Sequence, residues 1–211
     1  MSYSSTSSAV EAGVTGTWAD TEAACRLVVS AYTDPEAGTV EFEAMKSRLP
    51  GSAPSHPAGS WVLAGAAVEA GAVLDRRVDA AALYPLLRQW LEEGGVTLFA
   101  LGLAEKLAGI AAAAGCQWEL AERHFEKALR QADQLPYRVD QPEIRRWQAR
   151  MLLDRGEEGD LGRARELLIE ARAAYEEIGM PKHVGMVDSL LEAAAGTAAA
   201  GSEARPPLRS R

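Results

Sequence analysis

Aromatic residues, cysteines and histidines are all scarce in this 211-residue chain. Aromatic side chains make up 6% of it, and it holds two cysteines and three histidines. Because β-sandwiches draw on aromatic and β-branched residues, this composition favours closely packed helices. Cys25 and Cys116 have no metal or redox spacing, so we interpret them as buried free thiols in a reducing compartment. The expected location is therefore cytoplasmic.

An excess of basic residues is also missing. Acidic residues outnumber basic ones by 30 to 22, which gives a formal net charge of −8. Non-specific nucleic-acid binding needs a basic surface, and an anionic membrane attracts positive charge. Residues 138–172 are rich in arginine, but eight arginines there are offset by eight acidic residues. We therefore expect no nucleic acid and no membrane among the partners.

The sequence has no long uninterrupted apolar run, and we expect no leader peptide. The most apolar stretch, Val96–Ala114, carries Glu105 and Lys106 at its middle. A membrane-spanning helix rarely tolerates both charges, so we expect a buried helix over 96–114 in a soluble protein. The chain does not begin with a basic segment followed by an apolar one, and no signal peptide is predicted.

Motifs that carry chemistry are missing as well. The sequence contains no G-x-x-x-x-G-K-[ST] phosphate loop, no G-x-S-x-G and no H-E-x-x-H. A catalytic nucleophile needs a base within reach and a third group to orient that base. His56, His124 and His183 have no such neighbours in the sequence, and we interpret His124 as an ordinary residue on the flank of a helix. The sequence therefore predicts no enzyme, no cofactor and no metal.

What the sequence does contain is a helical pattern that occurs twice, 43 residues apart. Apolar residues recur in steps of three and four, which places them on one stripe of an α-helix. The spacing between the copies suits one helical hairpin. The two stripes consist of Trp118, Ala121, Phe125, Ala128, Ala132 and Leu135, and of Leu161, Ala164, Leu168, Ala171, Tyr175 and Ile178. A third, weaker copy occupies Val78–Glu93.

Turn residues divide the chain into an all-α arrangement of antiparallel hairpins. Pro85 lies inside the first hairpin, where it should kink the helix or delay its start. Asp160 is expected to cap the helix that follows it. We expect loose tails over 1–16 and 196–211, and between them one helical-repeat domain, 17–195. Within that domain we expect short helices over 19–32 and 35–47, a loop over 49–60, hairpins over 61–93, 96–135 and 142–178, and a capping helix over 181–195.

At Gly109, Ala121, Phe125 and Ala128 the chain resembles a tetratricopeptide-type (TPR) repeat. The strings AERHFEKAL, ARMLLDRGEEGDLGRARELL and EEIGMP are similar to the C-terminal repeat region of large bacterial signalling ATPases. Members of that class carry an adenylate/guanylate cyclase domain or a LuxR-type DNA-binding domain. The resemblance implies a right-handed TPR-like superhelix (α-α superhelix) of stacked hairpins. Gln148 departs from the class, which usually has a tyrosine there.

This resemblance leaves more than one function open. It implies a non-enzymatic TPR-like scaffold or regulatory domain that mediates protein–protein interaction, with a protein or peptide partner, in bacterial signal transduction. The alternative is a C-terminal regulatory fragment of a nucleotide cyclase, signalling ATPase or transcriptional regulator whose catalytic parts lie outside this chain. A small-molecule sensor that uses the alanine-lined interior is a third hypothesis.

The first helices of the hairpins should line the inner face of such a superhelix, and the partner groove is expected there. A groove around Trp147, Lys106 and Arg150 would suit a peptide with an acidic or aromatic anchor. The competing interpretation is that Trp147 only packs between hairpins. The predicted groove residues are Leu103, Lys106, Ile110, Ile144, Trp147, Arg150 and Met151.

Overall fold

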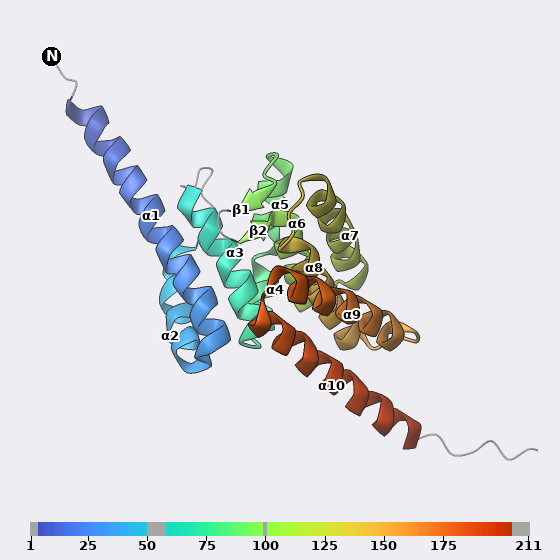
Figure 1. Cartoon of the computed structure of the whole chain (residues 1–211). Coiled ribbons are helices and arrows are strands. Elements are labelled where there is room, and N and C mark those ends of the chain that lie inside the picture. Colours follow the sequence, from blue (N-terminus) through green and yellow to red (C-terminus); the bar gives the residue numbers. More distant parts are fainter. Residues whose placement is uncertain (1–3, 50–57, 99–100, 204–211) are drawn as a thin grey trace, which may run out of the picture. The chain divides into compact units, whose positions relative to one another are not determined.

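The computed structural model describes residues 4–49, 58–98 and 101–203, with side chains over 18–49, 59–98 and 101–196 (Figure 1). The described chain is almost entirely helical, which confirms the all-α class. The helices form two compact units, residues 1–124 and 125–211. None of the described helices combines the length and the apolar character needed to cross a bilayer.

The first unit contains most of the helices. Its elements are α1 (Ser4–Thr33), α2 (Pro35–Met45), the 3-10 turn η1 (Lys46–Arg48), α3 (Ala58–Val73), α4 (Arg77–Ala82), α5 (Tyr84–Glu92), β1 (Thr97–Leu98), β2 (Gly102–Leu103) and α6 (Ala104–Ala114). The boundary between the units falls within α7 (Trp118–Gln134). The second unit continues with α8 (Asp140–Arg155), α9 (Asp160–Ile178) and α10 (Pro181–Glu203).

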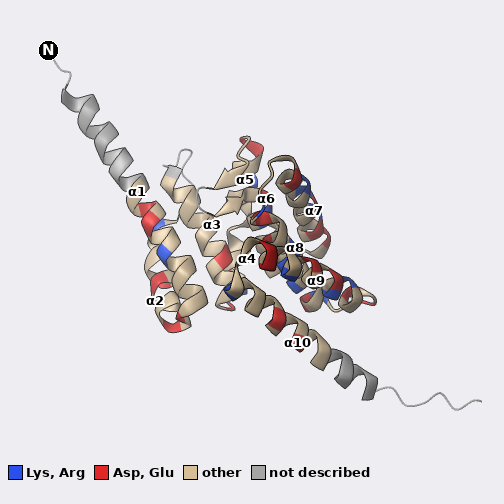
Figure 2. Cartoon of the chain, in the orientation of Figure 1, with Lys and Arg blue, Asp and Glu red and all other residues tan. Residues whose placement is uncertain are grey.

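Helix α3 forms the centre of the first unit. Every residue from Gly59 to Ala72 is buried, and Glu69 is the one charged residue of the helix (Figure 2). A helix that is apolar on all sides must be covered on all sides, and α3 packs against α1, α2, α4, α5 and α6. Glu69 accepts a 3.0 Å hydrogen bond from the hydroxyl of Tyr32, which gives its buried carboxyl group a polar partner.

Both ends of the chain are more helical than the sequence predicted. Helix α1 begins at Ser4, although a tail was expected as far as residue 16. Helix α10 continues to Glu203, beyond the predicted end at 195. Neither extension contains a proline, and alanine is frequent in the second, which is compatible with a helix. Over residues 4–16 and 196–203 the structure therefore has helix where the sequence predicted loose tails.

Pro85 divides the helix predicted over 78–93, as expected. Helix α4 ends at Ala82 and α5 begins at Tyr84, with Pro85 in its first turn. In the first turn a backbone N–H has no partner within the helix, so the missing N–H of proline does no harm there. The predicted break is confirmed, and it takes the form of a delayed helix start.

The continuous helix predicted over 96–114 is wrong for its first part. Thr97 pairs with Leu103 and Leu98 with Gly102 in a short antiparallel ladder, and α6 begins only at Ala104. Gly102 has a φ of +85°, which glycine adopts without steric cost. An apolar run alone does not separate a buried helix from a strand, and this explains the error.

Glycines and one ion pair define the turns of the second unit, where α9 packs against α8 and α10. Gly156 and Gly179 end α8 and α9 with φ angles of +68° and +84°. Asp160 does not cap α9, because Gly159 occupies the N-cap position. The carboxylate of Asp160 accepts hydrogen bonds from the Glu157 N–H at 2.9 Å and from Arg155 at 2.6 Å.

The two apolar stripes are buried as predicted. Their central side chains are all 0% exposed, and these are Ala121, Phe125, Ala128, Ala132, Ala164, Leu168, Ala171 and Tyr175. At the stripe ends, Trp118, Leu161 and Ile178 are half-buried, and Leu135 is 42% exposed. The stripes therefore belong to the hydrophobic core. The stacking of the hairpins into a TPR-like superhelix remains a prediction.

Candidate functional site

The residues predicted to line a partner groove offer little surface. Six of the seven are at most 4% exposed, namely Leu103, Lys106, Ile110, Ile144, Trp147 and Met151. Arg150 is half-buried and is the one with substantial surface. A partner therefore has direct access only to Arg150 among these side chains. The grouping of the seven into one groove stays a prediction.

Two arginines approach the ring of Trp147 on α8. The guanidinium carbons of Arg146 and Arg150 lie 5.0 and 5.2 Å from the ring centroid, within the range of cation–π contacts. The indole N–H is buried and has no hydrogen-bond acceptor among the described residues. The burial of Trp147 supports the interpretation that this side chain packs in the interior.

The two charges within the apolar stretch of α6 both have polar contacts. Lys106 Nζ donates a 2.8 Å hydrogen bond to the carbonyl oxygen of Leu101. Glu105 Oε2 lies 2.5 Å from His124 Nδ1. Both side chains are buried, at 1% exposure for Glu105 and 4% for Lys106. Because a buried charge without partners is strongly unfavourable, these contacts explain how an otherwise apolar helix keeps both residues.

His124 connects three helices through both of its ring nitrogens. Nδ1 faces Glu105 of α6, and Nε2 lies 3.0 Å from the hydroxyl of Tyr84 on α5. Burial raises the pKa of Tyr84, so the phenol keeps its proton and donates it to Nε2. Nδ1 then carries the ring proton and donates it to Glu105. The result is one hydrogen-bonded chain of hydroxyl, imidazole and carboxylate, which we call the Tyr84–His124–Glu105 chain.

Sequence reasoning missed this chain because its members are far apart in the sequence. Tyr84 lies 40 residues and Glu105 lies 19 residues from His124. The signal that was available is Glu105 itself, an acid within an apolar helix that must find a partner once buried. His183, by contrast, belongs to another cluster, and His56 lies outside the described residues.

A second buried polar cluster joins the three helices of the second unit. Glu143 of α8 accepts a hydrogen bond from Arg146 at 2.7 Å and another from the hydroxyl of Tyr175 on α9. His183 Nε2 of α10 lies 3.6 Å from the same carboxylate. Burial raises the pKa of Tyr175, which keeps this hydroxyl a donor. Since the members face one another, the cluster acts as a structural link.

Charges of alternating sign connect α2 to α4 on the surface of the first unit. Lys46 pairs with Glu43 at 3.3 Å and with Asp79 at 3.1 Å, and Arg76 also contacts both acids. Hydrogen bonding to Lys46 lowers the pKa of Glu43. Burial alone would raise the pKa of Asp79, but Lys46 and Arg76 outweigh it and lower that pKa. Because these charges satisfy one another, we interpret this cluster as a structural tie.

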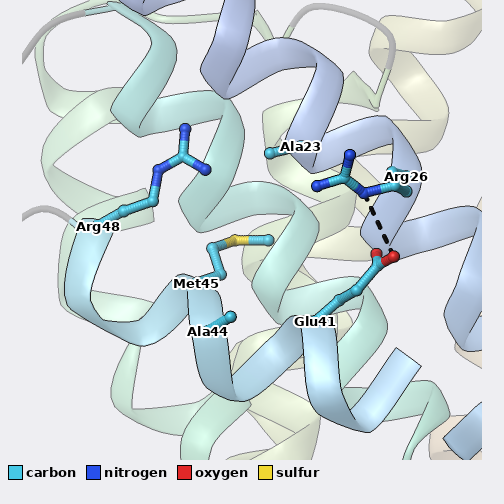
Figure 3. Close-up of a pocket in the computed structure, with 6 residues that line it drawn as sticks. All are labelled: Ala23, Arg26, Glu41, Ala44, Met45 and Arg48. Carbon is cyan, nitrogen blue, oxygen red and sulfur yellow. Dashed lines mark ion pairs between the residues drawn. The ribbon is translucent and has the colours of Figure 1, made fainter. Parts of the chain in front are cut away.

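A small pocket of about 80 Å³ lies between α1 and α2 (Figure 3). Its lining residues are Ala23, Arg26, Glu41, Ala44, Met45 and Arg48. Arg26 pairs with Glu41 at 3.3 Å, and Arg48 pairs with Asp20. Ligand pockets usually measure about 300–1,000 Å³, so this one suits a few water molecules better than a substrate.

Exposed large apolar side chains come together in one segment of the second unit. Leu135, Tyr137 and Val139 are 42%, 39% and 50% exposed and alternate along the loop between α7 and α8. Arg138, which lies among them, forms an exposed ion pair with Glu177 of α9 at 2.8 Å. We call residues 135–139 the apolar loop. Among the side chains that the structure describes, the other exposed large apolar residues are far apart in the sequence, namely Trp18, Val29, Val40, Val78, Val96 and Ile169.

The cysteines are free thiols, but the prediction that both are buried is wrong. Cys25 is half-buried, and Cys116 is exposed in the turn between α6 and α7. Turns of this kind lie at the surface, and Cys116 adopts a φ of +56° there. Over the residues that the structure describes, no three His, Cys, Asp or Glu side chains are grouped to hold a metal ion.

Comparisons with known proteins give no relative for this chain. No family model matches the sequence, and searches of curated proteins and of solved structures find no match either. The resemblance to TPR repeats and to the signalling ATPase class therefore rests on the sequence strings alone. Any function has to be argued from the described residues.

Proposed function

We propose that this chain is a non-enzymatic helical scaffold with TPR-like hairpins that binds a protein or peptide partner. The observation that carries this proposal is the apolar loop, in which Leu135, Tyr137 and Val139 are all at least 39% exposed. Isolated exposed apolar residues are normal on a protein surface, whereas apolar residues that form a contiguous patch mark interaction sites. The TPR resemblance supports the same class of function and suggests a role in signal transduction.

The chemistry of the apolar loop suggests what kind of partner it would bind. The Arg138 side chain is 65% exposed and pairs with Glu177, so the loop presents apolar and phenolic surface beside one exposed ion pair. Tyrosine provides a large contact area together with one polar atom and is frequent at the centre of interfaces. The partner we propose is therefore a protein segment that offers an apolar pocket to Tyr137.

A photo-crosslinking amino acid at position 137 tests where a partner binds. The full chain, labelled at Tyr137 or at Ile169, is added to extract from the source cell and irradiated. Ile169 is a matched control, because it is 61% exposed but lies in the middle of α9 and outside the loop. We expect one dominant crosslinked protein from position 137 and none of that protein from position 169.

Substitution then tests whether the apolar loop contributes binding energy. In the triple variant Leu135→Ser, Tyr137→Ser, Val139→Ser, binding of the crosslinked protein should weaken by more than about 30-fold, the size of an interface hot spot. Val78→Ser, at a site 85% exposed, should bind like the wild type. If Arg150→Ala weakens binding and the triple variant does not, the groove predicted from the sequence is the binding surface instead.

A further inference from the structure

The Tyr84–His124–Glu105 chain has the geometry by which enzymes activate a hydroxyl group. A nucleophile is activated when its hydroxyl lies within hydrogen-bond reach of a base and a third group orients that base. Tyr84 Oη lies 3.0 Å from His124 Nε2, and Nδ1 lies 2.5 Å from Glu105 Oε2. Tyr84, His124 and Glu105 thus occupy the places of nucleophile, base and orienting carboxylate.

The carboxylate of this chain is buried, and its base and its hydroxyl-bearing residue are less so, as activation of a nucleophile requires. Glu105 is 1% exposed and shielded from water, whereas His124 and Tyr84 are half-buried and keep part of their surface in contact with solvent. A shielded carboxylate holds the imidazole in one tautomer and one orientation. A small reagent therefore has access to part of the Tyr84 side chain.

We propose that Tyr84 is a base-assisted nucleophile that accepts an acyl group from an activated ester or thioester. Tyr84 Oη attacks the carbonyl carbon and forms an ester bond, while the bond from that carbon to the leaving oxygen or sulfur breaks. The phenolic proton passes to His124 Nε2, and the leaving group departs with the electron pair. His124 then returns the proton to the leaving group or to solvent, so the atoms and charges balance.

An uncharged acyl carbonyl suits the electrostatic surroundings of Tyr84. Two arginines, Arg88 and Arg123, and two glutamates, Glu92 and Glu105, act on its hydroxyl with opposite signs. Because these charges offset each other, they neither attract nor repel a neutral reagent strongly. Acylation would also remove the proton that Tyr84 donates to His124 and so break one link between α5 and α7.

The full chain treated with 4-nitrophenyl acetate tests this proposal, with peptide mass spectrometry to locate the acetyl group. Tyr137 is an internal control, because it is 39% exposed in the apolar loop and the described structure gives it no histidine contact. General-base assistance is worth about 10²–10⁴-fold, so Tyr84 should be acetylated at least tenfold faster than Tyr137 despite its lower exposure. Equal rates, or acetyl found on His124 and not on Tyr84, would overturn the proposal.

Variants of His124 and Glu105 separate chemistry from folding, and circular dichroism establishes that each is folded. His124→Gln can still hydrogen-bond but is no base, so acetylation of Tyr84 should fall to the rate of Tyr137. Glu105→Gln tests the positioning residue, and Glu105→Asp is its conservative partner. Glu105→Gln should slow acetylation of Tyr84 and leave that of Tyr137 unchanged, and Glu105→Asp, which keeps the carboxylate, should restore part of the Tyr84 rate. Equal rates in the two Glu105 variants would contradict a positioning role for the carboxylate. If none of these variants folds, the ratio of the acetylation rates of Tyr84 and Tyr137 in the wild type alone decides whether the proposal holds.

Discussion

Arg145 and Arg146 are neighbours on α8 in opposite surroundings. Arg145 is half-buried and pairs with Glu170, which is 61% exposed, at 2.8 Å. Arg146 is 5% exposed and pairs with the buried Glu143 at 2.7 Å. Water screens the attraction between Arg145 and Glu170. Arg146 and Glu143 are shielded from water, so each depends on the other to stabilise its charge. Two adjacent residues of the same type therefore have very different effects on stability.

Replacement of each arginine by methionine should show this difference. Arg146→Met leaves the carboxylate of Glu143 buried without its cation, and the free energy of unfolding should fall by about 3–5 kcal/mol. Arg145→Met breaks a screened pair and should cost less than about 1 kcal/mol. Urea unfolding of the full chain, followed by circular dichroism, measures both. Equal losses would mean that Glu143 is not buried as the structure shows.

Asp160 makes the stability of the second unit depend on pH. Hydrogen bonds from Arg155, and then from the Glu157 N–H, lower the pKa of Asp160 below its ordinary value of 3.8 despite burial. A carboxyl group whose pKa is lower in the folded state stabilises that state above its unfolded pKa. This stabilisation is lost as the pH falls through the folded pKa.

The variant Asp160→Asn should remove that dependence. At pH 7 its free energy of unfolding should be lower than that of the wild type by about 1.5–3 kcal/mol, the usual range for a hydrogen bond to a charged group. The difference should shrink below about pH 4, where the unfolded carboxyl group takes up its proton. Urea unfolding at several pH values between 7 and 3 measures it, and a constant difference would contradict the role of Asp160.

At the scale of the helices, α1 and α2 touch at a glycine. A Cβ atom at Gly38 would lie 2.9 Å from the backbone of Ala31, closer than side chains approach backbone. Gly162 on α9 is the opposite case, since nothing lies within 4 Å of an added Cβ there. Gly38 therefore permits the close approach of α1 and α2, whereas Gly162 is not needed for helix packing.

The substitutions Gly38→Ala and Gly162→Ala should therefore have opposite effects. Gly38→Ala forces α1 and α2 apart and should lower the free energy of unfolding by about 1–3 kcal/mol. Gly162→Ala replaces a poor helix former with a good one and should raise the free energy of unfolding by about 0.5–1 kcal/mol. Melting temperatures of the two variants give the comparison. A Gly38→Ala variant as stable as the wild type would show that the helices do not approach so closely.

The helices that the sequence predicts best are those with one apolar stripe. The stripes of α7 and α9 fix a buried side, and the predicted bounds of these helices are within one residue of those observed. Helix α8 buries Glu143, Arg146 and Gln148 together with its apolar residues. Sequence periodicity does not predict that these polar residues are buried, because their burial depends on hydrogen-bond partners that other parts of the structure supply.

The same limit applies to the candidate sites. The sequence identified Trp147 as a residue of interest but did not show that its ring is 3% exposed. It placed Tyr84 and His124 on helices but did not bring them together, since a contact across 40 residues depends on how the hairpins pack. Local periodicity predicts which side of a helix is buried, whereas partners across helices depend on tertiary structure.

At the scale of the whole molecule, the charges are numerous, and many of those on the described residues are paired. The chain carries a net charge of −8, and blue and red segments alternate along α9 (Figure 2). Arginines of the second unit pair with acids, for example Arg155 with Asp160 and Arg172 with Asp188 at 2.7 Å. Nucleic-acid binding needs cations that release counterions from phosphates, and these cations already face carboxylates.

The chain should therefore not bind DNA or RNA at physiological salt. Fluorescence anisotropy of a labelled 20-base-pair duplex, and of a single-stranded RNA, should stay flat as the protein is added up to about 100 μM, the upper end of the usual range of non-specific binding at about 1–100 μM. A rise that disappears at higher salt would reveal a basic surface that the charge pairs conceal.

Helix α3, whose residues from Gly59 to Ala72 are buried on every side, has a consequence for how this protein tolerates sequence change. A helix with a solvent face can vary there, so in a saturation mutagenesis scan α9 should accept replacements at positions that recur every three or four residues. Helix α3 has no such face. Its tolerance should be uniformly low, and lineages of this protein should diverge around α3 long before they diverge within it.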